Sequence, residues 1–152
     1  MKESLPDGTF SVQMENGRSL VFDGETNSLD ARGPGYSWKR FTFPLSVGKK
    51  WNYKRQTGTP PSNGFESASW QVKGYESVTV PAGTFDCFRV EGTIWTTYNS
   101  VLYGQSTSNQ DVTYWYCPAV KWFARMTVHR NGLWQGGMRE NESVLTSFSE
   151  VN

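Results

Sequence analysis

Short runs of β-branched and aromatic residues, separated by turn residues at hairpin spacing, recur along this chain of 152 residues. The clearest example is Glu76 to Val90, ESVTVPAGTFDCFRV, where two β-prone runs flank a Pro-Ala-Gly turn. Pro81 presets φ for the first turn position, and Gly83 is able to take the left-handed conformation. The stretch therefore predicts a three-residue hairpin closed by a glycine bulge, and we assign Pro81 and Gly83 a structural role in that turn.

Other segments follow the same pattern. The Asn-Gly pair within Glu15 to Gly17 separates two β-prone runs, Thr9 to Met14 and Arg18 to Asp23, and predicts a further hairpin. Alternating aromatics make Ser37 to Phe43 a predicted strand. The polar segments that we expect to be connections are Gln56 to Gly64 and Gly104 to Asp111.

The stretch from Ala119 to Arg130 alternates between two faces, as a strand with one buried side does. One face carries Val120, Trp122, Ala124, Met126 and Val128, and the other carries Lys121, Phe123, Arg125, Thr127 and His129. Phe123 is the only large apolar residue on the second, otherwise polar face. We therefore expect a half-buried antiparallel strand here.

Composition supports an all-β fold with one core. No window shows the 3.6-residue apolar period of an amphipathic helix, and the 15 Gly and 7 Pro residues favour turns. Apolar residues make up only 36% of the chain, but 7 Trp, 7 Tyr and 9 Phe bury the area of many aliphatic side chains. We predict a single all-β domain spanning residues 1–152.

Charge and hydropathy exclude several partners. With 15 Lys and Arg against 14 Asp and Glu, the formal net charge is +1, so we expect no nucleic-acid partner. No stretch approaches the roughly 20 apolar residues of a membrane span. The first residues, MKESLPDGTF, contain no apolar h-region, so we expect no signal peptide within this chain.

Three segments, in this order, resemble an uncharacterised family of bacterial envelope domains. Phe43 to Trp51 (FPLSVGKKW) is similar to its F-P-L-x-V-G-x-x-W segment, and Val78 to Phe85 (VTVPAGTF) to its V-P-A-G-T-F hairpin. Thr113 to Val120 (TYWYCPAV) is similar to its Y-W-Y-x-P-x-V strand, so the resemblance covers about residues 43–128. Lys121 stands where the family pattern more often has glycine, which argues against a tight bend at that point.

The resemblance implies a strongly twisted antiparallel sheet that forms a barrel or half-barrel, like those of lipoprotein-carrier proteins. Members of the family are domains of unknown function, often behind a signal peptide or a lipoprotein leader. The resemblance therefore implies an extracytoplasmic location: the periplasm, the outer membrane as a lipoprotein, or the outside of the cell. It implies no catalytic residue.

The two cysteines, Cys87 and Cys117, each lie in one of the family-like strands and are too far apart for a C-x-x-C motif. They could meet across the sheet or across the core and, in an oxidising compartment, pair as a disulfide. The alternative is a pair of buried free thiols that act as small apolar residues. The sequence leaves both possibilities open.

Candidate catalytic groups are sparse, and we predict that the protein is not an enzyme. His129 is the only histidine and falls on the polar face of its strand, which argues against a catalytic triad or a histidine-rich metal site. No phosphate-binding loop, dinucleotide fingerprint or G-x-S-x-G motif is present. We therefore expect no cofactor, no metal and no catalytic residue.

Aromatic side chains are the remaining functional signal. They could fill the interior of a curved sheet, line a cavity for an apolar ligand, or stack on sugar. Our leading hypothesis is a non-catalytic binding module that holds an apolar or lipid-like ligand on the concave side of the sheet. The candidate ligand-binding residues are Trp51, Trp70, Trp95, Trp115 and Trp122. The alternative is a structural or protein-interaction domain with a filled aromatic core that docks a protein partner.

Overall fold

The computed structural model describes residues 2–4, 9–13, 19–23, 27–29, 35–131 and 139–147. These residues form ten β-strands and no helix, so none of them offers a helix that could cross a membrane. The strands are β1 Lys2–Ser4, β2 Phe10–Gln13, β3 Ser19–Phe22, β4 Ser28–Leu29, β5 Lys50–Thr59, β6 Ser62–Val80, β7 Gly83–Ser100, β8 Gly104–Cys117, β9 Trp122–Asn131 and β10 Arg139–Val144. The predicted all-β class is confirmed.

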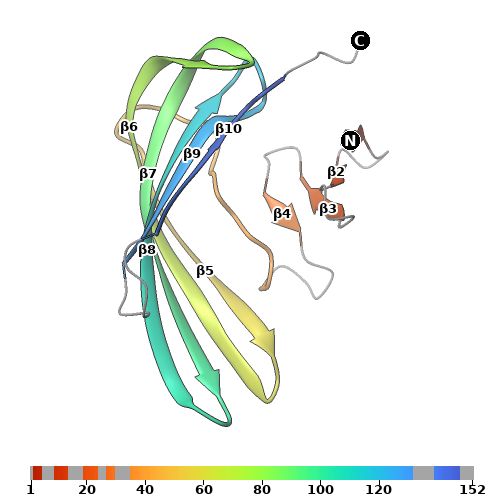
Figure 1. Ribbon diagram of the computed structural model, residues 1–152, viewed down its shortest axis with the longest axis vertical. Coiled ribbons are helices and arrows are strands. Elements are labelled where there is room, and N and C mark those ends of the chain that lie inside the picture. Colours follow the sequence, from red (N-terminus) through yellow and green to blue (C-terminus); the bar gives the residue numbers. More distant parts are fainter. Residues whose placement is uncertain are drawn as a thin grey trace.

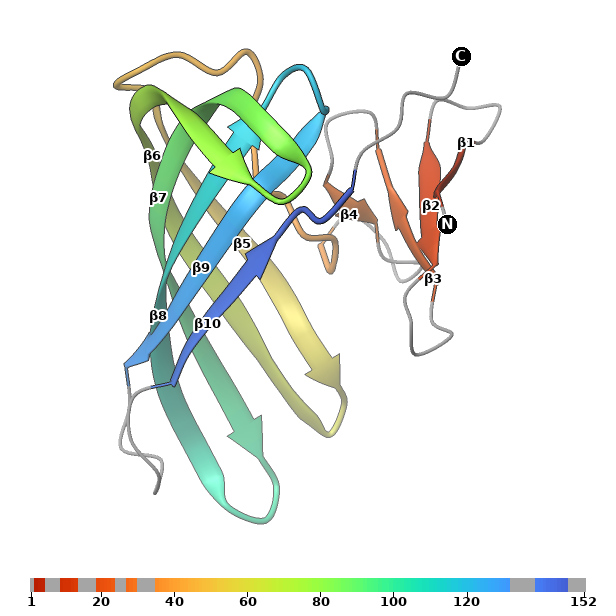
Figure 2. The same cartoon turned by 45° about the horizontal axis from the view of Figure 1, so that its top comes forward.

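Two sheets are built from consecutive antiparallel strands. The larger has six strands in the order β10-β9-β8-β7-β6-β5, and the smaller has four in the order β1-β2-β3-β4. The large sheet is open, because β5 and β10 are its two edges rather than neighbours. It curves around one side, and the small sheet lies on that concave side (Figures 1 and 2).

The concave face carries the main core. Alternate residues of the central strands point to this side, as the two-residue period of a strand requires. The buried residues of this cluster on the sheet are Ala68, Trp70, Val72, Val90, Ile94, Val112, Tyr114 and Tyr116. Phe41, from the connection between the two sheets, is buried against them. A second, smaller cluster surrounds Cys87 and Cys117.

The prediction that two polar segments are connections is wrong, because both segments belong to long hairpin arms. β5 and β6 remain paired out to Thr59 and Ser62, so only Pro60-Pro61 turns the chain within Gln56 to Gly64. Gly104 to Asp111 is the first half of β8 and pairs with β7. These arms extend beyond the core at one end of the sheet (Figure 1), where neither face needs an apolar pattern.

The N-terminal part agrees with its prediction in part. β2 and β3 form the expected antiparallel hairpin, with Phe10 opposite Phe22. Its predicted turn, Glu15 to Gly17, lies outside the described residues. Ser37 to Phe43 is not a strand: apart from an isolated bridge at Trp38, it runs over the concave face without regular pairing. Its aromatics pack against the sheet instead of joining it.

The Pro-Ala-Gly hairpin joins β6 to β7 but is tighter than predicted. Val80 pairs with Gly83, so the connection has two residues, Pro81 and Ala82, with no bulge at the glycine. Gly83 has a φ of 137°, a backbone conformation that side chains with a Cβ rarely adopt. A glycine is therefore needed at this position for the reason that the sequence suggested, although the turn type differs.

A β-bulge in β9 places some of its side chains on a different face of the sheet from the one predicted. Tyr116 pairs with Phe123 while Trp115 pairs with Arg125, which leaves Ala124 as an extra residue in the strand. The shift brings Phe123 to the concave core together with Met126 and Val128. Phe123 was predicted to be the one large apolar residue on a polar face, but it belongs to the concave core.

Lys121 ends a tight turn between β8 and β9, although the sequence predicted no tight turn there. Its φ of 55° is left-handed, and its N–H donates to the carbonyl oxygen of Cys117 at 3.0 Å. A side chain with a Cβ costs about 1–2 kcal/mol in this conformation, whereas glycine adopts it freely. The tight bend that the sequence argued against is thus present, and it is built with a lysine.

We expect Lys121→Gly to raise the free energy of unfolding by up to about 1 kcal/mol, since the relieved strain exceeds the entropy that glycine adds to the unfolded chain. Urea unfolding measures the change. Lys121→Ala is the control, because it removes the charge but keeps the Cβ. Equal stability of the two variants would contradict the assigned backbone strain.

Candidate functional site

The concave face of the large sheet is filled by aromatic side chains of the chain itself. Phe41 has no solvent exposure, and its ring centroid lies 5.1 Å from that of Tyr116 and 5.6 Å from that of Tyr114. Phe43 follows it, with its centroid 5.1 Å from Tyr116. Offset and edge-to-face contacts at these separations are favourable packing geometries. This part of the concave face therefore has the character of a core.

Hydrogen bonds fix the segment that carries Phe41. Asn27 is buried, and its side-chain Oδ1 accepts from the backbone N–H of Arg40 at 3.0 Å and of Phe41 at 3.4 Å. The hydroxyl of Tyr53 donates to the carbonyl oxygen of Ser37. The segment is thus held from both sides, by the small sheet and by β5.

Arg40 joins the two sheets in a way that the sequence analysis did not anticipate. Its guanidinium carbon lies 5.8–5.9 Å from the centroids of four rings, and its Nε donates to the hydroxyl of Tyr114 at 3.3 Å. The rings belong to Phe22, Tyr114, Trp122 and Phe123. No pattern in the sequence indicated this cluster, because its members come from four separate segments.

Two of the five candidate tryptophans lie together on the concave face. Trp51 on β5 is directly opposite Trp70 on β6. The Trp70 ring covers Gly92 on β7, where a Cβ would lie 2.1 Å from Cε3 of the indole, so only glycine leaves room for it. Both indole Nε1 groups are buried and have no hydrogen-bond partner among the described residues.

The other three candidates do not join this pair. Trp95 follows Ile94, a concave-core residue, so it points to the convex face, where it is 49% exposed. Trp115 also leaves the concave face: its Nε1 donates to Glu76 at 2.8 Å, and the Arg125 guanidinium lies 4.9 Å from its ring. Trp122 packs edge-on against Phe22, with centroids 5.2 Å apart. The five indoles therefore do not converge on one cavity.

Two depressions of the described surface are open, and their linings mix polar and apolar groups. One, of about 550 Å³, lies on the convex face over the middle of the sheet. Its charged lining residues are Lys50, Lys73, Glu91 and Asp111. Another, of about 330 Å³, lies by the β5–β6 arm beside Tyr36 and Thr57. Neither has the apolar lining of a typical small-molecule pocket.

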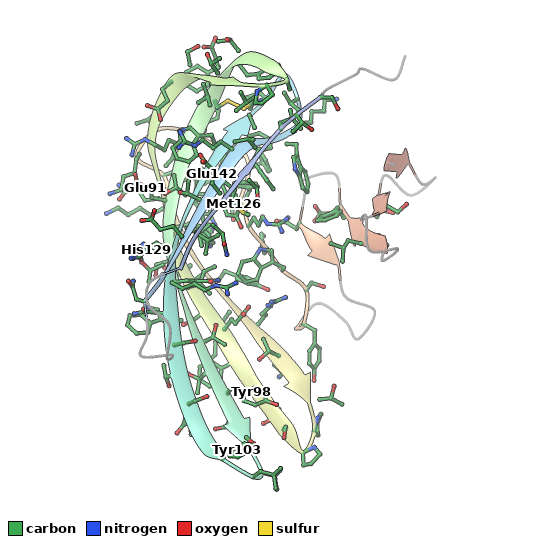
Figure 3. The ribbon with its side chains drawn as sticks, in the orientation of Figure 1. Glu91, Tyr98, Tyr103, Met126, His129 and Glu142 are labelled. Atoms are coloured by element: carbon green, nitrogen blue, oxygen red, sulfur yellow. A yellow bond between two sulfur atoms is a disulfide. The ribbon has the colours of Figure 1, made fainter. Side chains whose placement is uncertain are left out.

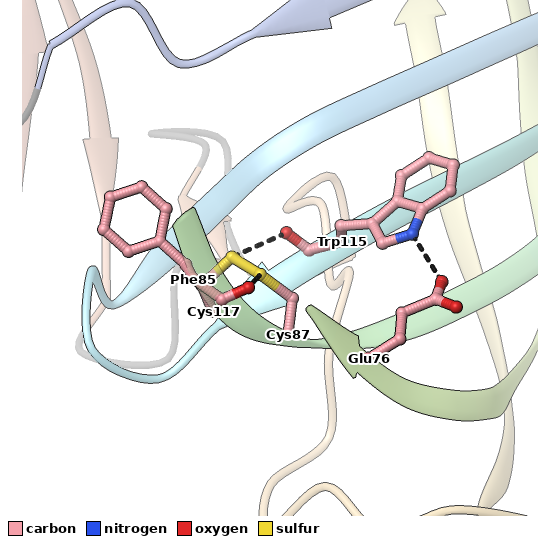
Figure 4. The surroundings of a disulfide bond; sticks show 5 residues. All are labelled: Glu76, Phe85, Cys87, Trp115 and Cys117. Atoms are coloured by element: carbon pink, nitrogen blue, oxygen red, sulfur yellow. Dashed lines mark hydrogen bonds between the residues drawn. A yellow bond between two sulfur atoms is a disulfide. The ribbon is translucent and has the colours of Figure 1, made fainter. Parts of the chain in front are cut away.

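The cysteines are joined by a disulfide between β7 and β8 (Figure 4). Both are fully buried, and the sulfurs lie 3.4 Å from the carbonyl oxygens of Phe85 and Trp115. Val78, Val80, Val120 and Ala124 complete the buried cluster around the bond. The disulfide closes the end of the sheet opposite to the long arms.

The histidine predicted to lie on a polar face and two tyrosines are notable titratable groups among the described residues. No group of three His, Cys, Asp or Glu side chains there is placed to hold a metal ion. His129 meets Glu140 of the neighbouring strand, with Nδ1 and Oε1 3.3 Å apart. Burial raises the pKa of Tyr53 and of Tyr116 above the usual value of 10.0.

No protein-family model matches this chain, and no curated protein or solved structure matches it either. The resemblance to envelope domains therefore remains an expectation from three sequence segments. The function has to be argued from the geometry of the chain itself.

Proposed function

We propose that this protein is a non-catalytic, extracytoplasmic interaction domain that docks a protein partner. Its large sheet would be a half-barrel of the kind found in lipoprotein-carrier proteins, with the concave side occupied by its own chain. The observation that carries the proposal is the position of Phe41, which is fully buried among Phe43, Tyr114 and Tyr116. An apolar ligand bound there would have to displace a packed core residue.

The disulfide supports the extracytoplasmic part of the proposal. Stable disulfides persist in oxidising compartments and are rare in the reducing cytosol. The bond between Cys87 and Cys117 is fully buried and braces two neighbouring strands, as a structural disulfide does. This fits the location that the sequence resemblance implies.

The arrangement of polar groups supports a non-catalytic role. Catalytic acids and bases usually lie in clefts where burial and charge shift their pKa values strongly. In the described residues, the groups with raised pKa are the two tyrosines of the packed interior, Tyr53 and Tyr116. Their shift follows from core burial and does not require a reaction.

A small apolar or lipid-like ligand is the second candidate, and one observation favours it. The buried Nε1 groups of Trp51 and Trp70 are donors without a partner among the described residues. Buried polar groups in proteins are normally satisfied, so an acceptor on a bound molecule would relieve a real cost here. Such a ligand would reach the edge of the core at β5 rather than the filled centre.

Native mass spectrometry of protein purified without detergent, followed by organic extraction, distinguishes the two candidates. We expect a bare mass of 17.2 kDa and no apolar compound in the extract. A naphthalene-sulfonate dye should likewise stay dark with the native protein. A retained lipid-like mass, or dye fluorescence that Trp51→Phe and Trp70→Phe abolish, would overturn the interaction-domain proposal in favour of the ligand carrier.

A further inference from the structure

The tip of the β7–β8 hairpin presents three consecutive large apolar side chains to solvent. Val101, Leu102 and Tyr103 are 67%, 82% and 89% exposed, respectively. They form the connection between Ser100 and Gly104, the last pair of the β7–β8 ladder. Figure 3 shows Tyr103 at the far end of the molecule, well beyond Tyr98 on the same arm.

This composition contradicts the ordinary chemistry of a tight turn. Hairpin turns favour Gly, Asn, Asp, Pro and Ser, whereas β-branched and large apolar residues gain nothing from an exposed turn position. Two other tips of the large sheet, Pro60-Pro61 and Pro81-Ala82, each contain the proline that turns favour. Where a local rule is broken without a benefit to folding, a function is the expected reason.

The apolar tip is held in a defined shape. The hydroxyl oxygen of Ser100 accepts from the backbone N–H of Leu102 at 3.2 Å and of Tyr103 at 3.3 Å. The strands below it are paired from Ser100 and Gly104 onward, so the three apolar residues stand at the end of a regular hairpin. The two satisfied N–H groups lower the cost of bringing the tip into an apolar medium.

The end of the molecule that carries this tip has no charge on its strands. Gly92 to Gln110 contains no Asp, Glu, Lys, Arg or His, and neither does Gln56 to Phe65 on the adjoining arm. Both arms point the same way (Figures 1 and 2). Ser, Thr, Asn, Gln and Tyr predominate there, so this end contacts water or lipid headgroups without desolvating a formal charge.

We propose that the Val101-Leu102-Tyr103 tip inserts into the interfacial region of a lipid bilayer and docks the protein on an uncharged, zwitterionic membrane surface. Exposed apolar side chains drive such insertion, and tyrosine favours the headgroup level. The lack of charge predicts binding that needs no anionic lipid. A protein partner fits less well, because a stable interface needs about 800 Å² from each side, more than a projecting three-residue tip provides. The proposal stands whether the concave core is filled or holds a ligand.

Flotation of the full chain with phosphatidylcholine vesicles tests the proposal. The wild-type protein should float with the vesicles, and raising the salt concentration should not release it. Leu102→Asp should weaken the partition by roughly tenfold or more, since a charge replaces the leucine side chain that inserts into the bilayer. Ala119→Asp is the matched control: it places the same residue in an exposed turn at the opposite end of β8 and should leave flotation unchanged.

Each other outcome overturns the proposal. Absence of wild-type flotation removes the membrane as the partner, and equal behaviour of the two aspartate variants removes the tip as the contact. Binding that requires anionic lipid and disappears in salt assigns the attraction to charged residues elsewhere. If the wild type is a dimer without lipid and Leu102→Asp dissociates it in analytical ultracentrifugation, the tip contacts a second copy of the chain. Matching melting temperatures of all three proteins show that folding is not the cause.

Discussion

Replacing Phe41 with alanine is expected to lower the free energy of unfolding by about 3–5 kcal/mol, the usual cost of removing a fully buried phenylalanine. Phe41 has no exposed surface and contacts the rings of Phe43, Tyr114 and Tyr116. Tyr114 and Tyr116 belong to a paired sheet, so their rings cannot collapse freely into the space. Both the lost burial and the residual cavity therefore contribute.

Urea unfolding of the wild type and of the variant measures this loss, as a lower midpoint at an unchanged denaturant slope. Phe65→Ala is the control, because Phe65 lies on β6 outside the core and is 37% exposed. Its loss should cost about 1 kcal/mol or less, including the contact with the Lys54 ammonium 4.3 Å from its ring centroid. If Phe41→Ala costs no more than Phe65→Ala, the segment is a displaceable plug, and the ligand-carrier hypothesis becomes the better one.

The all-β class was predictable because the central strands bury one face. Where Val72, Val90 and Val112 meet the core, the sequence alternates and the strand assignment follows. Beyond Ile94 the arms of β7 and β8 have no core beneath them, so the alternation ends although the backbone pairing continues. This is why Gly104 to Asp111 looked like a connection.

Two other wrong predictions, the faces of β9 and the strand at Ser37 to Phe43, have a cause other than a missing core. The bulge at Ala124 shifts β9 by one residue, and nothing in the alternating pattern marks an extra residue. Ser37 to Phe43 has the composition of a strand, but its rings contribute more by covering the concave core than by extending the edge at β5. Both outcomes depend on contacts between segments distant in sequence, which local propensity does not encode.

The candidate site was only partly predictable. The hypothesis placed five tryptophans on the concave side of the sheet, and the structure places Trp51 and Trp70 there as an opposed pair. The sequence could not separate them from Trp95, because the faces of β7 are fixed by register with β6 and β8. The exposed tip at Leu102 was missed, since an apolar residue at the end of a β-prone run is normally read as the last buried position of a strand.

Loss of the disulfide is the second large effect that we expect. Replacing Cys87 and Cys117 together with alanine should lower the free energy of unfolding by about 3–4 kcal/mol and the melting temperature by roughly 10 °C. The bond spans a sequence separation of 30 residues, so it removes substantial freedom from the unfolded chain. Reducing the wild-type protein should produce a similar loss, and the double variant should not respond to reductant.

The disulfide between the two cysteines also makes the stability of the protein depend on the redox state of its compartment. Cys87 and Cys117 continue the β7–β8 ladder one position beyond Phe88 and Tyr116, and both are buried, so the bond braces the sheet where its pairing begins. In a reducing compartment the chain would lose this contribution, which is a large share of the 5–15 kcal/mol that stabilises a typical domain. We therefore expect no free thiol in protein recovered from an oxidising compartment, denatured without reductant. Two titratable thiols in that sample would contradict both the disulfide and the extracytoplasmic proposal. A bond that forms but leaves the melting temperature unchanged on reduction would contradict only its structural role.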